Sequence, residues 1–119
     1  MNIKILLPAV FTLVMGSAML GLWFVLYTQK QIPELVTEPV RIGFHIAAEM
    51  ITAILLVLSG IALLMGWQIA TWLYPLSTGM LFYTAIVSPG YYAQKGQWGF
   101  VWMFLIILLL AFANLTIFL

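Results

Sequence analysis

The chain has 119 residues, of which 66% are hydrophobic and 6% are charged, and its formal net charge is +1. This composition excludes a soluble globular domain, because a chain of this size could not hide so much apolar surface from water. The small net charge gives no basis for binding nucleic acid, and the absence of cysteine excludes disulfides, thiolate metal sites and dithiol redox chemistry. We therefore expect a single membrane domain.

Four apolar runs are each long enough to cross a bilayer, whose hydrocarbon core of ~30 Å needs ~20 helical residues. They cover about residues 5–27, 42–66, 69–87 and 98–119. The connections between them are short, which favours antiparallel neighbours. The sequence therefore predicts an all-α fold, an integral membrane four-helix bundle of up-down-up-down topology, with residues 1–119 forming one transmembrane domain.

The first run follows Lys4 and so resembles a secretory signal peptide. Its apolar stretch is longer than the ~7–15 residues of a signal-peptide core, and no good cleavage site interrupts it. We expect it to be retained as a membrane span.

The three connections differ in character. Residues 28–41 form the longest, and Trp67 and Gln68 form a tight turn. In residues 88–97 the pair Pro89-Gly90 predicts a turn after the third helix, either an interfacial turn or a cap over a pocket. Pro75 is expected in the first turn of the third helix, where a missing amide proton matters little.

Arg41, His45 and Glu49 follow one another at intervals of four residues near the start of the second run. Residues four apart are neighbours on a helix, so Arg41 is expected to reach His45, and His45 to reach Glu49. Glu49 lies roughly 10 Å inside the predicted span. A charged side chain deep in a bilayer costs about 2.5 kcal/mol or more, so the stripe is interpreted as a site for a proton or a polar ligand.

A structural interpretation of the same residues remains open. Arg41 can extend its charged end to the lipid headgroups. His45 and Glu49 can instead fix helix packing or an oligomer contact by hydrogen bonding. One histidine is too few for a closed zinc site, and haem would need a second ligand from another molecule. We predict no metal, no cofactor and no catalytic residue.

Equal depth in the bundle suggests which other side chains approach His45. On this basis the sequence places Tyr83 and Thr84 of the third helix, Trp102 of the fourth and Tyr27 of the first at the same level. Tyr83 is the predicted hydrogen-bond partner of Glu49.

Pairs of small residues four apart permit helices to approach closely. Three such pairs occur: Ser17 and Gly21, Gly43 and Ala47, and Ala62 and Gly66. Because such pairs are common by chance in apolar sequence, they indicate only where close approach is permitted.

Basic residues suggest an orientation. Lys30, Arg41 and Lys95 fall on the side of the first and third connections, and Lys4 falls on the other. The positive-inside rule therefore places residues 28–41 and 88–97 in the cytoplasm and both termini outside, although the bias is small enough to allow dual topology.

Two resemblances extend these predictions. Residues 44–49 (FHIAAE) together with residues 88–95 (SPGYYAQK) resemble a group of small, uncharacterised prokaryotic four-span membrane proteins. That resemblance implies an integral protein of the prokaryotic cytoplasmic membrane and implies no activity.

The second resemblance is to the MAPEG family of membrane glutathione transferases. It is carried by Glu38, Arg41, His45 and Glu49 and by the pair Gly90-Tyr91. It implies a trimeric four-helix assembly. The sequence departs from the family pattern where Ile46 replaces an asparagine, and where Ile86 and Ser88 replace an arginine and a tyrosine. Without those donors a glutathione thiolate would lack its main electrostatic support.

Three functional hypotheses follow. The first is a non-enzymatic, oligomeric membrane protein whose site handles a proton, an ion or a small polar-headed lipophilic ligand, proton-coupled efflux being one variant. The second is a MAPEG-like transferase, and the third is a structural or accessory subunit of a membrane complex. The expected partners are the lipid bilayer and either a second copy of the chain or another membrane protein. The predicted site comprises Arg41, His45, Glu49, Tyr83, Thr84 and Trp102.

Overall fold

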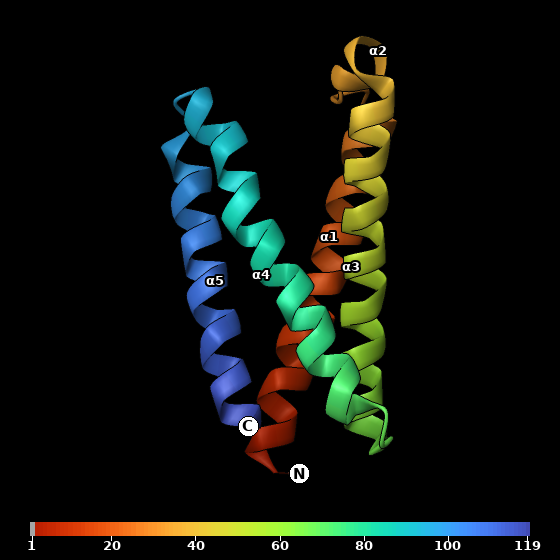
Figure 1. Ribbon diagram of the computed structural model, residues 1–119, viewed down its shortest axis with the longest axis vertical. Helices are drawn as coiled ribbons and strands as arrows, with labels where there is room; N and C mark the ends of the chain where they lie inside the picture. The colour runs from red at the N-terminus through yellow and green to blue at the C-terminus, as the bar shows by residue number, and fades with distance from the viewer. Residues whose placement is uncertain (1) are drawn as a thin grey trace.

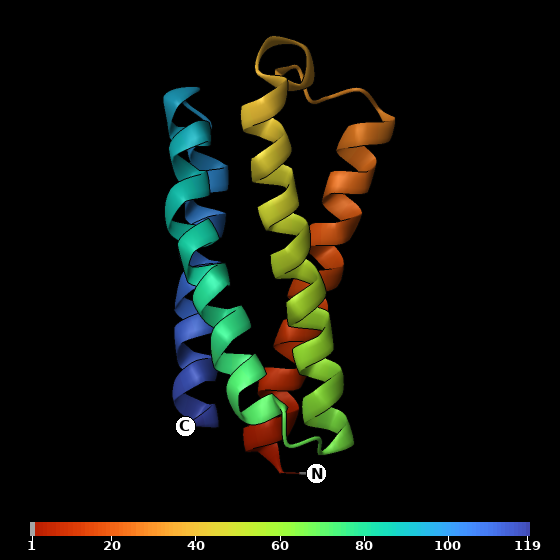
Figure 2. The same cartoon turned by 45° about the vertical axis from the view of Figure 1, so that its right-hand side comes forward.

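The computed structural model describes residues 2–119, and this part of the chain is all-helical. Four long helices, α1 (Ile3–Thr28), α3 (Pro39–Met65), α4 (Ala70–Gln94) and α5 (Trp98–Phe118), are joined by short connections, the first of which contains the short helix α2 (Glu34–Thr37). Consecutive long helices run in opposite directions (Figure 1, Figure 2). Both termini therefore lie at one end of the molecule, the terminal end, and α2 lies at the other, the loop end.

Three of the long helices, α1, α3 and α5, are long and apolar enough to cross a membrane. Helix α4 has the length, at 25 residues, but its two prolines and its hydroxyl-bearing side chains make it less apolar. Only the three-span part of the four-span prediction is therefore supported by length and composition. The longest dimension of the molecule, 46 Å, is close to the ~40–45 Å thickness of a bilayer with its headgroups.

The turn predicted at Pro89-Gly90 is wrong, because α4 continues through both residues to Gln94. A proline in a helix removes one amide donor, here the donor for the carbonyl of Ala85, and packing against other helices offsets that loss. The connection to α5 is therefore only residues 95–97, where Gly96 adopts a positive φ of 72°. The segment predicted to form a cap is the last two turns of a helix.

Other boundaries differ by a few residues. Helix α3 begins at Pro39 rather than near residue 42, since a proline is well suited to the first turn. Pro75 lies inside α4, five residues after its start at Ala70, and not in its first turn as predicted. The tight turn before α4 is confirmed: Gly66 ends α3 in the left-handed conformation, and the amide of Trp67 donates to the carbonyl of Ala62.

Helices α1 and α3 make the most extensive contact in the molecule, and two glycines allow it. A Cβ atom on Gly16 would lie 2.7 Å from the carbonyl oxygen of Ala53, and one on Gly60 would lie 2.5 Å from Cγ of Leu13. The glycines of the three small-residue pairs, Gly21, Gly43 and Gly66, are not points of close contact, since a Cβ on each would meet nothing within 4 Å. Ala62, the partner of Gly66, is fully buried in the core beside Ala9 of α1.

The buried core occupies the middle of the molecule and its terminal end. One cluster gathers around Tyr74, whose ring lies 4.6 Å from that of Phe118 on α5. A second gathers around Leu56 of α3 and Leu81 of α4. Towards the loop end the helices are separated by cavities, and the candidate site lies there.

Candidate functional site

A cleft of about 230 Å³ opens between α3 and α4 in the half of the molecule nearer the loop end. Helix α3 contributes His45, Ala48, Glu49 and Thr52, which share one face because they are three or four residues apart. Helix α4 contributes Met80, Tyr83, Thr84, Val87 and Ser88. The cleft therefore combines apolar walls with a small group of polar side chains, as ligand sites commonly do.

Glu49 is the one charged side chain that lines this cleft. Only 7% of its side chain is exposed, and it lies ten residues after the start of α3 at Pro39, roughly 15 Å along the helix at ~1.5 Å per residue. Its Oε1 lies 3.4 Å from Nε2 of His45, one turn nearer the loop end. The predicted proximity of these two side chains is confirmed.

His45 is held between two elements. Its imidazole contacts Glu49 on its own helix, and its ring lies edge-on to that of Trp23 on α1, with centroids 6.0 Å apart. The His45 side chain is 39% exposed, so it remains open to the cleft. The imidazole is therefore in contact with α1 as well as with its own helix.

Thr52 adds acceptor character to the cleft. Its hydroxyl donates its proton to the carbonyl of Ala48, at 2.8 Å, within its own helix. The hydroxyl oxygen can then only accept hydrogen bonds from a ligand. The Glu49 carboxylate and the Thr52 hydroxyl, whose proton is already donated to Ala48, thus lie about one helical turn apart in the same wall of the cleft.

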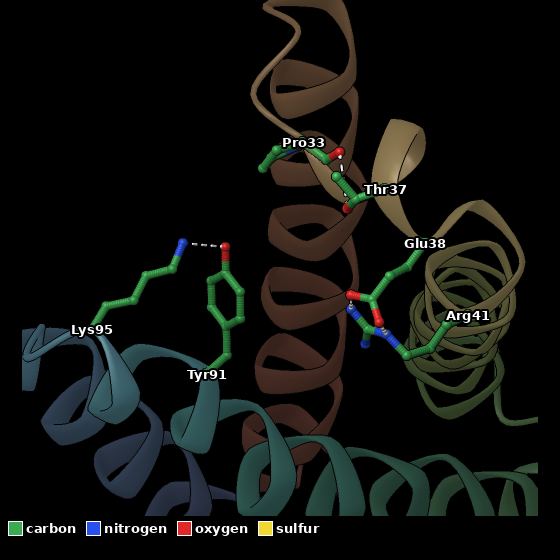
Figure 3. A network of polar contacts seen from close by, with 6 residues as sticks. All are labelled: Pro33, Thr37, Glu38, Arg41, Tyr91 and Lys95. Carbon is green, nitrogen blue, oxygen red and sulfur yellow. Dashed lines mark hydrogen bonds and ion pairs between the residues drawn. The ribbon is translucent and has the colours of Figure 1, made fainter.

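Arg41 does not take part in this site, contrary to the prediction. Its guanidinium forms two hydrogen bonds with Glu38, at 3.1 Å and 2.9 Å, beyond the start of α3 (Figure 3). The negative charge of Glu38, three residues away, attracts the guanidinium more strongly than an uncharged imidazole would. The Arg41 guanidinium in turn lowers the pKa of the fully exposed Glu38 carboxyl.

Lys95 is also engaged elsewhere at the loop end. Its Nζ donates to the hydroxyl of Tyr91 at 2.6 Å and lies 4.2 Å from the centre of that ring (Figure 3). This hydrogen bond raises the pKa of the exposed Lys95 ammonium. Among the residues 2–119, no lysine or arginine forms an ion pair with Glu49.

The other predicted site residues divide into two groups. Tyr83 and Thr84 line the cleft, as expected from their depth. Tyr83 is 70% exposed, however, and forms no hydrogen bond with Glu49 in the described part of the chain. Trp102 is 63% exposed on α5 and is absent from the cleft lining. Residues at the same depth in a bundle face each other only if their helices are rotated suitably about their own axes. Depth alone therefore could not show that Trp102 faces away from the cleft.

Several residues of the site were not predicted, among them Ser88 and Trp23. Ser88 lines the cleft because α4 continues through Pro89, and a helix drawn through that proline would have placed it one turn beyond Thr84. The contact of Trp23 with His45 depends on how α1 and α3 cross, which no local pattern encodes.

A second, larger cavity of about 470 Å³ lies between α1, α3 and the first connection. It is lined by apolar and aromatic side chains: Leu20, Trp23, Phe24, Tyr27, Ile32, Ile46 and Met50. Tyr27 therefore lines this cavity and not the cleft of Glu49. Trp23 lines this larger cavity and His45 lines the cleft of Glu49, so the contact between their rings lies between the two cavities.

Comparison with known proteins places the chain in a family. Residues 2–119 match the family described as Domain of unknown function (DUF8058). The chain belongs to this family. No curated protein and no solved structure matches the chain. The family description assigns no activity and is not that of the MAPEG transferases, so that resemblance stays a prediction, and function has to be argued from the cleft itself.

Proposed function

We propose that this chain is a small integral membrane protein in which Glu49 and His45 bind a proton, an ion or the polar head of a small lipophilic ligand in the cleft between α3 and α4. The observation that carries the proposal is the burial of Glu49 beside a cleft, with the partly exposed imidazole of His45 3.4 Å from its carboxylate. Ionisable groups at membrane depth are expensive and therefore mark functional sites by default.

The exposed surface supports insertion into a bilayer. Large hydrophobic side chains are exposed on all four long helices. In α5, only 6% of an apolar stretch of 18 residues is buried within the molecule. Soluble monomers rarely expose apolar patches of more than ~300–600 Å². Lipid, or a membrane partner, is the environment that matches such a surface.

The arrangement of charges supports one orientation. Lys30, Arg41 and Lys95 lie in or beside the connections at the loop end, and Lys4 lies near the start of α1 at the terminal end. Under the positive-inside rule the loop end faces the cytoplasm, and the mouth of the cleft lies on that half of the membrane.

The proposal can be tested by chemical modification of carboxyl groups in lipid nanodiscs. Dicyclohexylcarbodiimide partitions into the bilayer, whereas a water-soluble carbodiimide does not. We expect the lipophilic reagent to form an adduct on Glu49, and the water-soluble reagent to react with Glu34 and Glu38, which lie outside α3. Mass spectrometry of peptides identifies the modified residue.

The matched controls are Glu49→Gln, which should abolish the lipophilic adduct, and Glu38→Gln, which should leave it unchanged. A Glu49 that is modified only by the water-soluble reagent would place the cleft in water and would contradict the proposal. Absence of any adduct on Glu49 would contradict it equally, since a ligand site must admit a small apolar reagent.

A further inference from the structure

We propose that the ligand of the cleft is a small organic cation, with an ammonium head that binds Glu49 and an apolar body that lies against α4. This inference rests on the proposed function and narrows it from a proton, an ion or any polar-headed lipophile to one chemical class. It follows from the charges near Glu49, from the acceptors in the cleft wall and from the size of the cleft.

The first argument is the missing counter-ion. Arg41, eight residues away and two turns nearer the loop end, pairs with Glu38, and Lys95 bonds to Tyr91. Within residues 2–119, the nearest charged or chargeable group to Glu49 is His45, which is charged only when protonated. A buried carboxylate without a permanent cation nearby is unfavourable. A cationic ligand would supply the positive charge beside Glu49 that neither Arg41 nor Lys95 provides.

The second argument is the hydrogen-bonding character of the α3 wall. Glu49, when ionised, can only accept hydrogen bonds, and the Thr52 hydroxyl has already given its proton to Ala48. An ammonium carries several donors and no acceptor, which complements such a wall. A ligand with a carboxylate or phosphate head would bring further acceptors to this wall, and its negative charge would lie close to that of Glu49.

The third argument is size and lining. At about 230 Å³ the cleft is smaller than the ~300–1,000 Å³ of sites for drug-sized molecules, so its ligand is small. Met80, Val87 and Ala48 provide apolar contacts for a hydrocarbon body. The aromatic ring of Tyr83 lines the same cleft, and aromatic rings attract cations.

The experiment uses two probes of nearly identical shape, benzylammonium and benzyl alcohol, which differ in charge. Saturation-transfer difference NMR on the full chain in phosphatidylcholine nanodiscs, at about pH 7, gives a dissociation constant for each. We expect benzylammonium to bind at least about tenfold more tightly than benzyl alcohol, and Glu49→Gln to remove that preference.

Two further variants keep the test decisive. Glu38→Gln removes a carboxylate outside the cleft and makes the same change in net charge, so it should retain cation binding. Glu49→Asp keeps the negative charge, so it should retain the preference for benzylammonium even if its affinity is reduced. A Glu49→Gln chain that fails to fold therefore leaves the Glu49→Asp and Glu38→Gln results to decide.

Three results would overturn the inference: equal affinity for the alcohol and the ammonium, equal binding of benzylammonium to wild type and Glu49→Gln, or no binding of benzylammonium to wild type. If the lipophilic carbodiimide still modifies Glu49 in those cases, the carboxyl serves a proton or another ligand, and the proposed function survives alone. If the lipophilic carbodiimide does not modify Glu49 either, both the organic-cation inference and the proposed function are contradicted.

Discussion

From the level of Gly16 to the terminal end, α1 and α3 are in close contact, and α4 packs on them through Tyr74 and the buried Ser59–Ser77 hydrogen bond of 2.8 Å. Towards the loop end the same helices are separated by two cavities, and the polar group that faces one of them, Glu49, has no charged partner apart from a protonatable imidazole. In the packed half the buried hydroxyls of Ser59 and Ser77 are therefore hydrogen-bonded to each other, whereas in the open half the Glu49 carboxylate faces a cleft.

This difference teaches how a small helical protein can combine a packed region and an open region in one chain. Helices of the same chain form a close-packed half, whose substitution should affect stability, and an open half, whose substitution should affect binding. Regions that bind ligands are drawn from the less stable parts of a fold. The following substitutions test whether the packed half determines stability and the open half determines binding.

Gly16→Ala should have the largest effect on stability. The added Cβ would lie 2.7 Å from both the Ala53 carbonyl oxygen and Cγ2 of Val57, and a backbone carbonyl cannot move aside cheaply. Overpacking of this kind costs about 1–3 kcal/mol, so we expect the free energy of unfolding in mixed micelles to fall by that amount. Gly21→Ala on the same helix is the matched control, because its Cβ would meet nothing within 4 Å. A destabilisation as large at Gly21 would contradict the predicted contact.

Ser59→Ala and Ser77→Ala should each lower stability, and the two changes should not add. The hydroxyls share one hydrogen bond, and Ser59 also lies 3.1 Å from the carbonyl oxygen of Leu73. Hydrogen bonds between membrane helices contribute about 0.6 kcal/mol on average and up to ~1.7 kcal/mol. A double-mutant cycle measures the coupling energy, which we expect within that range, and a coupling energy of zero would show that the pair does not join α3 to α4.

Tyr74→Phe should leave the free energy of unfolding unchanged or raise it by up to about 1 kcal/mol. The Tyr74 hydroxyl is fully buried and has no hydrogen-bond partner within the described chain, so the substitution removes an unsatisfied group and keeps the ring against Phe118. Tyr27→Phe, at a position 68% exposed, is the control and should be neutral. A clear loss of stability in Tyr74→Phe alone would mean that this hydroxyl has a partner, such as a bound water.

The smallest effect should come from the exposed Glu38–Arg41 pair. Arg41 lowers the pKa of Glu38 below its ordinary value of 4.5, so the pair stabilises the folded state above that value, and the contribution disappears as the pH falls through the lowered pKa. An NMR titration of Glu38 should show the pKa rising towards 4.5 in Arg41→Gln and in high salt. An unchanged titration would show that the pair does not form.

Much of the fold could be predicted because it depends on local pattern. The lengths of the apolar runs predicted four long helices, and the spacing of His45 and Glu49 predicted their contact. The turn at Pro89 could not be ruled out locally, because a proline followed by a glycine is a strong turn signal, and yet α4 continues through both residues. The local preference and the observed structure differ there.

The composition of the site was less predictable for two physical reasons. Arg41 had two possible partners within four residues, His45 and Glu38, and the charged one, Glu38, forms the pair. The rotation of α5, which leaves Trp102 63% exposed, is set by which face meets α4, and in a uniformly apolar helix no stripe identifies that face. Depth alone is therefore a weak guide to neighbours.

The most direct test of the division between a packed half and an open half is the thermal stability of Glu49→Gln in nanodiscs, measured beside Ser59→Ala. If Glu49 is held for a ligand, replacing a buried carboxylate by a neutral group of the same shape removes a desolvation cost, and the melting temperature should stay the same or rise while Ser59→Ala lowers it. A fall for Glu49→Gln as large as that for Ser59→Ala would show that Glu49 holds the helices together, and would contradict the assignment of the cleft as a binding site.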